Sequence, residues 1–550
     1  MLQVPYTNNR GMATLIALIM VGMLTLIGIA AVSTSDDEVK VAGNDLQATR
    51  AFYAAESGLD IAAAGLVEEF ELNGMPPATM PAGSDEINGC TVTYEAKKTA
   101  SGERKVLSNG NLAGLYGAID SYAAISVGTD NLARSSVELA QTFEAALVPI
   151  FQFAVFYNDD LEFSPGADMT LIGRIHSNGD MYLQSKTTLK MDSYVSANGN
   201  IFHGRKSAGI VSDGDVQIKN AKGQYESMKQ GSDWLDSKDA WWKDSSLARW
   251  NGRVKDDAHD QKALDMNLTS GDDPRKLIEP AAGNPDSYEN KASLKFINNQ
   301  AYEYQSGSWV NVTAAMTALG VITNNPDKFF DQREADFVDA FELDIKKLYE
   351  SGYGPDNGVI YYHTDAAAGQ YPALRLKNGE EVGAPLTIAS NNPVYTLGNF
   401  NTTNKQPVSI LSDALTFLSA NWDDTKGALL KTDRPASNTT VNCSYITGAG
   451  ESSALTYGGG FENLVRLLED WSGNRTLSWT GSAAKMWESM QANGLFGTTY
   501  FNEPKRNWKY DSNLDDPNNL PPESPVARVF QRTGWKQQYV GYKTEIDSLL

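Results

Sequence analysis

The feature that most constrains this chain is an apolar stretch without charged residues near its N-terminus, from Met12 to Val32. As a helix, the stretch is long enough to cross the hydrocarbon core of a bilayer, which takes roughly 20 residues. The apolar part of a cleaved signal peptide normally covers only ~7–15 residues. A membrane helix that is kept is therefore the favoured prediction. Cleavage after the small residues Ala31-Val32-Ser33 is the alternative.

The charges around this stretch predict its orientation. Arg10 precedes it, and Asp36, Asp37 and Glu38 follow it. Because the basic side of a membrane helix tends to stay in the cytoplasm, we expect the N-terminus inside and the bulk of the chain outside.

Helical periodicity continues beyond the apolar stretch. Apolar residues recur at steps of three and four from Val39 to Phe70, which is typical of an amphipathic helix with one apolar stripe. Asn73-Gly74 and Pro76-Pro77 are expected to end it. The stripe is available to a partner or to the chain's own globular part, and a plain anchor with a helical stalk fits the same pattern.

Two motifs in this region carry a family resemblance. A leader that ends in Arg10-Gly11 directly before the apolar helix resembles a type IV prepilin, and "RAFYAAESGLDIA" (50–62) is similar to the signature of PilX-type pilus assembly proteins. The resemblance implies that a prepilin peptidase cuts after Gly11, so that Met12 becomes the first residue and the helix is kept. It also implies an inner-membrane location followed by the pilus or cell surface, with other pilin-like subunits as partners of the helix.

The chain departs from the major pilins at one position. Those proteins carry a glutamate at the fifth mature residue, which is Ile16 here. A carboxylate in lipid is costly and needs a partner, in pilins the terminal amine of a neighbouring subunit. Ile16 resembles minor pilins and large pseudopilins that are thought to lie at a filament tip. The mass of 59.8 kDa points the same way, because a shaft of such subunits would be crowded.

Composition limits the partners of the exterior part. The chain has 46 basic and 68 acidic residues, and this net charge of −22 repels nucleic acid and anionic lipid, so no nucleic-acid partner is expected. With 41% hydrophobic residues the chain is globular, and its length exceeds a single core. We predict an α+β protein: a long N-terminal transmembrane and amphipathic helix, then a large β-rich exterior region with helical insertions.

The two cysteines, Cys90 and Cys443, leave two alternatives open. Outside the cytoplasm a disulfide between them is permitted, provided that their Cα atoms lie within ~7 Å. Two separate buried thiols are the other alternative.

Three related phrases suggest repeated coils. "IHSNGDMYL", "VSANGNIFH" and "IVSDGDVQI" each place a glycine in a polar turn before a short strand, at Gly179, Gly199 and Gly214. Short strands with recurrent Gly turns predict coils of a β-solenoid, and an ordinary run of hairpins is the alternative.

Later segments change character. A polar stretch contains Trp234, Trp241, Trp242 and Trp250, which either stack on a sugar or cover the edge of a core. Helical spacing returns over 328–352. The predicted organisation is a leader (1–11), a transmembrane helix (12–32), its amphipathic extension (33–74), a pilin-like small sheet (75–155), a β-rich repeat region (156–220), a polar Trp-rich insertion (221–327) and a mixed β-rich C-terminal region (328–550).

No motif predicts catalysis or a cofactor. The four histidines lack metal-binding spacing, and there is no nucleophile elbow or phosphate loop. Asp511, Asn513 and Asp515 resemble the start of a calcium loop, but Asp516 and Pro522 replace its glycine and glutamate. An exposed acidic turn is therefore favoured over a metal site.

The favoured function is structural. We expect a minor component of a type IV pilus or related filament, with an acidic head that is displayed at the tip or primes assembly. One alternative is an adhesin head for a surface or polysaccharide. The other is an anchored or secreted carbohydrate-active enzyme, because β-solenoids host such enzymes and 68 acidic residues can supply a carboxylate pair.

Overall fold

The computed structural model describes residues 10–73, 77, 79–108, 110–132, 135–207, 212–269, 273–450 and 457–539. The chain divides into two compact units. We call them the helix–sheet unit (Met1–Glu103, Ile119–Ala145 and Phe530–Leu550) and the solenoid unit (Arg104–Ala118 and Ala146–Val529).

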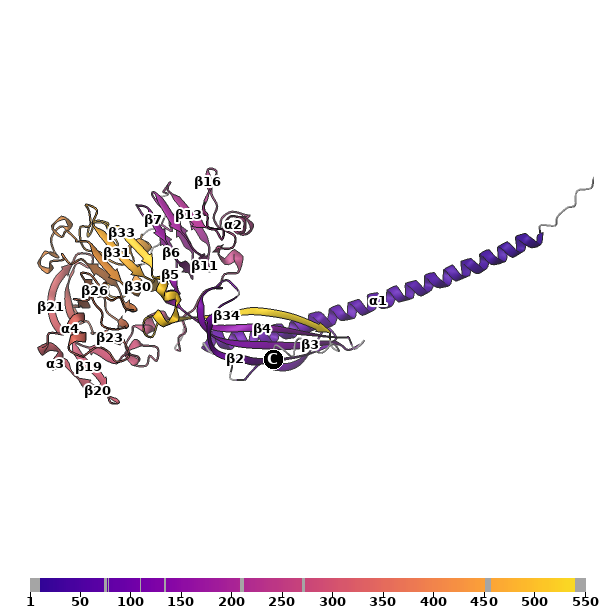
Figure 1. The fold of residues 1–550 in the computed structure, drawn as a ribbon, viewed down its shortest axis with the longest axis horizontal. Coiled ribbons are helices and arrows are strands. Elements are labelled where there is room, and N and C mark those ends of the chain that lie inside the picture. Colours follow the sequence, from indigo (N-terminus) through magenta and orange to yellow (C-terminus); the bar gives the residue numbers. More distant parts are fainter. Residues whose placement is uncertain are drawn as a thin grey trace, which may run out of the picture. The chain divides into compact units, whose positions relative to one another are not determined.

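The helix–sheet unit consists of one long helix and one five-stranded sheet (Figure 1). The helix is α1 (Arg10–Asn73), and it ends where the Asn-Gly and Pro-Pro signals predict. The sheet has the order β1 (Ala82–Ile87), β2 (Cys90–Val106), β3 (Tyr116–Asp130), β4 (Ser136–Pro149) and β34 (Val526–Tyr539).

The second part of α1 packs on this sheet. Its buried side chains recur at helical spacing, which places them on one face: Ala51, Ala54, Ala55, Gly58, Leu59, Ala62, Ala63, Leu66 and Phe70. All of them except Ala54 and Gly58 form a core with Tyr122, Leu139 and Phe143 of β3 and β4. The predicted apolar stripe is therefore covered by the chain's own sheet from Ala51 onward. Val39 and Leu46 of the same stripe stay exposed.

The sheet differs from the predicted small sheet of 75–155 in its last strand. β34 comes from the far end of the chain and pairs beside β4. Phe530 of this strand lies 5.6 Å from the ring of Phe143 and 5.9 Å from the ring of Phe70. Such a pairing between distant segments has no local signal in the sequence.

The solenoid unit begins with stacked coils, as the repeated phrases predict. Val155 pairs with Ile175, and Ile175 pairs with Val195, in parallel strands 20 residues apart. Three faces of the coil repeat in this way. They contain β5 (Phe153–Tyr157), β8 (Arg174–Ser177) and β11 (Val195–Ala197); β6 (Leu161–Phe163), β9 (Met181–Leu183) and β12 (Ile201–His203); and β7 (Met169–Leu171), β10 (Thr188–Met191) and β13 (Asp215–Lys219).

The glycines mark corners where successive coils touch. A Cβ atom at Gly199 would lie 2.3 Å from the Asp180 side chain, and one at Gly179 would lie 2.4 Å from the Asp160 side chain. Gly214 occupies a different corner, because its Cβ would meet the carbonyl oxygens of Ser185 and Thr187 before β10. The third phrase therefore belongs to the solenoid but is out of phase with the first two.

The second half of the solenoid winds back toward the first. Beyond β17 (Val254–Lys255) the chain crosses to the other end of a twelve-stranded sheet, and its last strand in that sheet, β32, pairs in parallel with β5. The strands that follow in this sheet are β18 (Leu294–Ile297), β19 (Gln300–Gln305), β20 (Ser308–Asn311), β23 (Val359–His363), β25 (Leu386–Ser390), β27 (Val408–Ser412), β30 (Ser444–Ala449) and β32 (Ala483–Glu488).

Two further sheets complete these coils. One contains β21 (Ile322–Asp331), β22 (Asp336–Asp344), β24 (Tyr371–Lys377), β26 (Val394–Leu397) and β28 (Leu415–Leu418), and the other contains β29 (Thr439–Asn442), β31 (Thr476–Gly481) and β33 (Lys505–Tyr510). Apart from the β21–β22 hairpin, the strands within each pair in parallel. Apolar side chains of both halves share one core.

The helical prediction over 328–352 is wrong for most of its length. This segment forms the end of β21, all of β22, and only then the short helix α4 (Ile345–Glu350). β22 lies between β21 and β24, and its second half is buried throughout. A short apolar run buried on both faces cannot be told from a helix by periodicity alone.

The predicted insertion of 221–327 contains β17 to β20, which belong to the twelve-stranded sheet. It also supplies small elements around the coils: β14 (Tyr225–Ser227), β15 (Lys229–Gln230), β16 (Asp233–Trp234), α2 (Trp242–Trp250) and α3 (Thr313–Ala318). Trp242 and Trp250 are buried in the solenoid core, and Trp234 stacks on His203 with ring centroids 3.4 Å apart. These three cover the edge of a core, which was one of the two alternatives. Trp241 is exposed.

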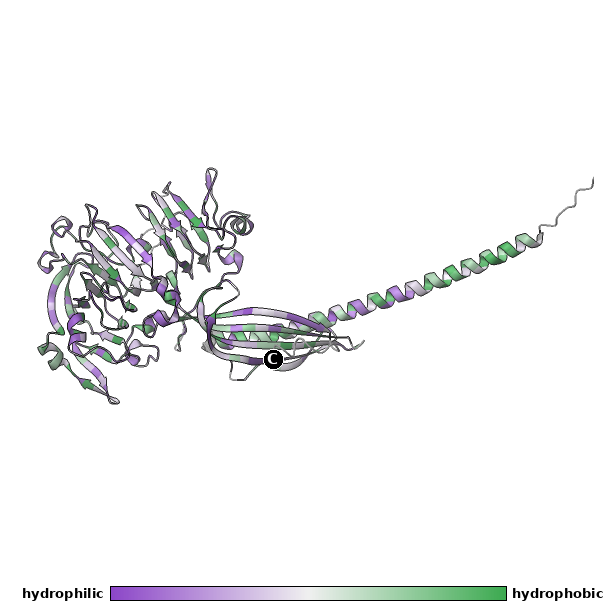
Figure 2. Cartoon of the chain, in the orientation of Figure 1, coloured by the Kyte–Doolittle hydropathy of each residue, from purple (hydrophilic) through white to green (hydrophobic). Residues whose placement is uncertain are grey.

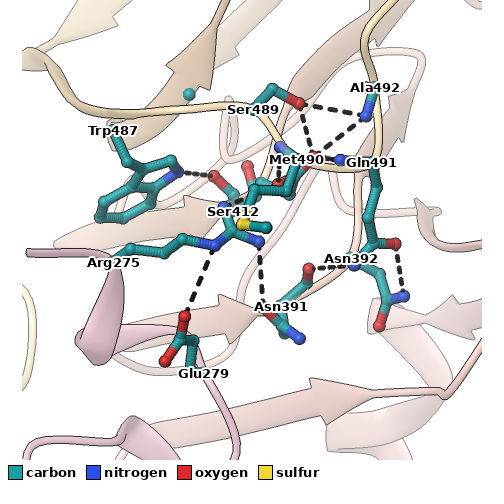
Figure 3. A network of polar contacts seen from close by, with 12 residues as sticks. Arg275, Glu279, Asn391, Asn392, Ser412, Trp487, Ser489, Met490, Gln491 and Ala492 are labelled. Carbon is teal, nitrogen blue, oxygen red and sulfur yellow. Dashed lines mark hydrogen bonds and ion pairs between the residues drawn. The ribbon is translucent and has the colours of Figure 1, made fainter.

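A buried polar network fixes the crossing segment to the coils (Figure 3). Arg275, in the 3₁₀ helix η3 (Pro274–Leu277), donates to Asp413 at 2.8 Å and to Asn391 at 3.2 Å. Asp413 also accepts from the Ser489 hydroxyl at 2.6 Å and from the backbone N–H of Met490 at 2.8 Å. A buried carboxylate is tolerated when it is paired and hydrogen-bonded in this way.

Candidate functional site

The first part of α1 is the candidate functional site. No side chain from Gly11 to Arg50 is buried. Figure 2 shows the N-terminal part of α1 as almost continuously hydrophobic. Within the part of the chain that the structure describes, α1 is the one helix long and apolar enough to cross a membrane. An apolar surface of this length is unstable in water, so it needs lipid or the apolar face of another helix.

The residues at the predicted processing point lie inside this helix. Nothing lies within 4 Å of a Cβ atom added at Gly11, and the side chain of Met12 is 63% exposed. Ile16 is 53% exposed and leaves the segment from Gly11 to Ser35 without a charged side chain. The surface that the segment offers to lipid or to another helix is therefore uncharged throughout.

Two threonine hydroxyls in this segment have partners within the helix. The hydroxyl of Thr25 donates to the Val21 carbonyl at 2.7 Å, and that of Thr34 donates to the Ala30 carbonyl at 2.9 Å. Such back-bonding satisfies a hydroxyl where no water is present. The first acidic residues follow at Asp36 and Asp37, and Lys40 pairs with Asp37 on the exposed surface.

The "RAFYAAESGLDIA" motif marks where the helix meets the sheet. A Cβ atom at Gly58 would lie 2.2 Å from the Ser126 hydroxyl, and one at Gly128 of β3 would lie 2.1 Å from the Ala51 carbonyl oxygen. The small residues of the motif, with Ala54 and Ala55 buried, therefore allow β3 to approach the helix backbone. Glu56 of the motif is exposed. Periodicity predicted an apolar stripe through this motif, but it did not reveal the close backbone approach that the small residues allow.

The weak metal candidate is not assembled as a binding loop. Asp511 accepts from the Asn513 backbone N–H as the cap of η8 (Ser512–Asp515), and it pairs with Lys405 at 2.7 Å. Asp515 accepts from the Tyr510 hydroxyl at 2.8 Å. Among the described residues no group of three or more His, Cys, Asp or Glu side chains is placed to hold a metal ion. These contacts fit the acidic turn.

The two cysteines are free. Cys90 is buried in the helix–sheet unit and Cys443 is buried in the solenoid unit, and both lie among the described residues. Of the two alternatives left open by the sequence, the structure therefore shows two separate buried thiols and no disulfide. Burial in apolar surroundings raises the pKa of both thiols, which makes them poor nucleophiles.

One arrangement that the sequence did not reveal is a buried Ser–His–Asp set. The Ser246 hydroxyl oxygen lies 2.8 Å from His259 Nε2, and His259 Nδ1 lies 2.7 Å from an Asp256 carboxylate oxygen. These contacts resemble those of a hydrolase triad. Ser246 and Asp256 have no exposed surface, however, and Asp256 also accepts from Trp242 and Ser237. In this structure the set fastens α2 to η2 (Asp257–His259), and no short motif announces it.

A long helix with a free apolar half, and a second half packed on a β-sheet, defines a type IV pilin-like N-terminal part. Residues 10–60 match the family model described as PilX N-terminal. This segment, which includes the predicted processing point and most of the small-residue motif, is therefore similar to the PilX N-terminal family. The match ends before the strands of the sheet begin.

Two other comparisons add little. The structure is similar to the crystal structure of the competence-associated pilin ComZ from Thermus thermophilus, with 11% identity, 90% of this chain and 98% of that chain covered, and a TM-score of 0.26. A score this low supports no inference about the arrangement. No curated protein matches the sequence.

Proposed function

We propose that this chain is a minor pilin-like component of a type IV pilus or related filament. In this proposal a prepilin peptidase cuts after Gly11, the inner membrane holds the helix, and the free half of α1 then packs among the helices of other pilin-like subunits. The observation that carries the proposal is the apolar half of α1, which the chain itself leaves uncovered.

The position in the filament is the finer part of the proposal. Ile16 provides no carboxylate for the terminal amine of a neighbouring subunit, and the acidic solenoid unit adds a large mass to each copy. Both features favour the tip or a priming role over the shaft. The solenoid unit is then a displayed structural or binding head, and we propose no reaction for it.

Mass spectrometry of the N-terminus tests the processing step. The chain would be isolated from cell envelopes and from sheared filaments, and we expect its first residue to be Met12 in both. A Gly11→Val variant should keep Met1 and be absent from filaments. Gly22→Val is the matched control, because both glycines lie in α1 with nothing within 4 Å of an added Cβ atom.

The other outcomes contradict the proposal in different ways. A wild-type chain that keeps Met1 would be a plain membrane-anchored head. A chain that begins near Ser33 would be a secreted protein, and its helix would have no part in a filament.

A further inference from the structure

A groove of about 910 Å³ runs along the coils of the solenoid unit. Its size is at the upper end of ligand pockets, which measure roughly 300–1,000 Å³. One side is α4, with Lys346, Tyr349 and Glu350. The other side consists of the turns that follow three adjacent parallel strands, β24, β26 and β28.

The turns are held in a fixed stack, so the groove is built into the fold. The backbone N–H of Thr402 donates to the Glu380 carbonyl at 2.7 Å, and that of Asn401 donates to the Gly379 carbonyl at 2.7 Å. The Asn399 side chain donates to the Glu380 carboxylate at 3.3 Å. Because parallel strands repeat every ~4.8 Å, the three turns span roughly 10 Å along the solenoid axis.

Tyr349 lies in the wall of the groove between two glycines. A Cβ atom at Gly383 would lie 2.7 Å from its ring, and one at Gly354 would lie 2.8 Å from it. Any side chain at Gly383 would therefore collide with the ring from the groove side. The glycine keeps this wall open, and Tyr349 is only partly buried.

The lining selects the chemistry of a ligand. Glu350, Glu380 and Glu381 are exposed acidic groups, whereas the one lining lysine, Lys346, lies 3.7 Å from Glu350. This excess of negative charge disfavours an anionic ligand. Among the described residues no group of three or more His, Cys, Asp or Glu side chains is placed to hold a metal ion here. A peptide needs buried apolar anchors, and the lining offers few beyond Tyr349 and Leu397.

We infer that this groove binds a carbohydrate chain without acidic groups, such as a neutral or amino-sugar polymer. Its hydroxyl and amine donors match the carboxylate acceptors of Glu350, Glu380 and Glu381. A linear polymer matches the direction of the stacked turns. The inference takes from the proposed function only that the solenoid unit faces the exterior, and it names the ligand class of the displayed head.

Titration of the purified full chain in detergent tests the inference independently of any filament. The probes are hexamers of N-acetylglucosamine, glucosamine and galacturonic acid, which are neutral, cationic and anionic respectively, with heat of binding as the readout. We expect saturable binding of the neutral or the cationic hexamer, at least tenfold tighter than the anionic one. No saturable binding, or a preference for the anionic hexamer, would overturn the inference.

Two variants tie binding to the groove. Ala420 is an exposed groove residue after β28, so Ala420→Trp should fill the groove and weaken binding at least tenfold without disturbing a core. Ala318→Trp, at an exposed position of α3 outside the groove, should bind as the wild type does. Unchanged affinity in Ala420→Trp would place the binding elsewhere and refute the inference. A wild-type chain that does not begin at Met12 but still binds the hexamer would contradict the proposed function. It would leave the inference about the groove intact.

Discussion

Single side chains decide how closely the helix and the sheet of the helix–sheet unit approach. At Gly128 an added Cβ atom would meet the Ala51 carbonyl oxygen and, at 2.6 Å, the Ala55 backbone nitrogen. Backbone atoms cannot move aside as a flexible side chain can, so the strand itself would have to shift. The close approach therefore depends on glycine in β3 as much as on the small residues of the helix.

The close contact at Gly128 predicts that adding a single methyl group there has a large effect on stability. Gly128→Ala should destabilise the helix–sheet unit by about 2–3 kcal/mol through overpacking. Native-state hydrogen exchange of the β3 amides in detergent would measure it. Gly43→Ala is the control: nothing lies within 4 Å of its added Cβ, and alanine favours a helix by up to ~1 kcal/mol over glycine. Equal protection in the two variants would contradict the packing argument.

His176 provides a test of pH dependence in the solenoid unit. Its ring is completely buried, near Phe153 and Phe156, and hydrogen-bonds Ser196 at 2.8 Å and Asn178 at 3.0 Å. Burial lowers its pKa from 6.5 to about 4. Between these values the unfolded chain binds a proton that the folded chain does not, so stability falls as the pH falls through this window.

The contribution of His176 to the free energy of unfolding should fall by about 3 kcal/mol between pH 7 and pH 4. This follows from ~1.4 kcal/mol for each pH unit that separates the two pKa values. Urea unfolding of the wild type and of His176→Asn across this range would measure it. The variant loses packing at every pH, but the stability difference from the wild type should shrink by about 3 kcal/mol on acidification. A difference that stays constant with pH would mean that His176 does not titrate as described.

At the scale of helices and strands, sequence patterns correctly predicted the features that depend on residues close together in the sequence. α1 ends at Asn73, as the Asn-Gly and Pro-Pro signals indicate, and Gly179 and Gly199 occupy equivalent solenoid corners. The apolar first half of α1, which is the candidate site, was likewise visible in the sequence. What the sequence could not show depends on distant partners: β22 became a strand because strands flank it on both sides, and β34 returns from the end of the chain.

The groove beside α4 was missed for the same reason. The stacking of β24 and β26 brings together the turns that contain Glu380 and Asn399, and Tyr349 comes from α4, which follows the neighbouring strand β22. No motif connects them. The buried Ser246, Asp256 and His259 are also united only by packing.

β34 should hold the C-terminal end of α1 through one aromatic contact. Phe530 packs between Phe70 of the helix and Phe143 of β4. Because this side chain is only partly exposed, Phe530→Ala should cost about 2 kcal/mol, less than the 3–5 kcal/mol of a fully buried phenylalanine. Faster hydrogen exchange in β4 and β34 would report the loss.

Trp535 of the same strand is the matched control. It is 49% exposed and lies 6.3 Å from the ring of Phe52, so Trp535→Ala should cost less than about 1 kcal/mol. If the tryptophan variant exchanged faster than the phenylalanine variant, β34 would be held by its exposed face instead.

For the whole molecule, the topology explains how a large head is carried by a pilin-like unit. Residues 150–525 lie between β4 and β34, which are neighbours in the sheet. Within the solenoid unit the entering and leaving segments are also adjacent, since the Ile150 N–H donates to the Pro525 carbonyl at 3.0 Å. Insertions between neighbouring chain ends are the kind that domains tolerate. The helix–sheet unit therefore keeps its sheet while it carries the solenoid.

The proposed place at a filament end makes a prediction about copy number. Each copy brings the solenoid unit and the net charge of −22 of the whole chain, and neighbouring copies along a shaft would repel one another. Ile16 also withholds the carboxylate that a shaft contact would use. We expect about one copy per filament, so that its ratio to the major subunit falls in inverse proportion to filament length. Quantitative mass spectrometry of long and of sheared, size-fractionated filaments would measure this ratio, and a ratio independent of length would place the chain in the shaft.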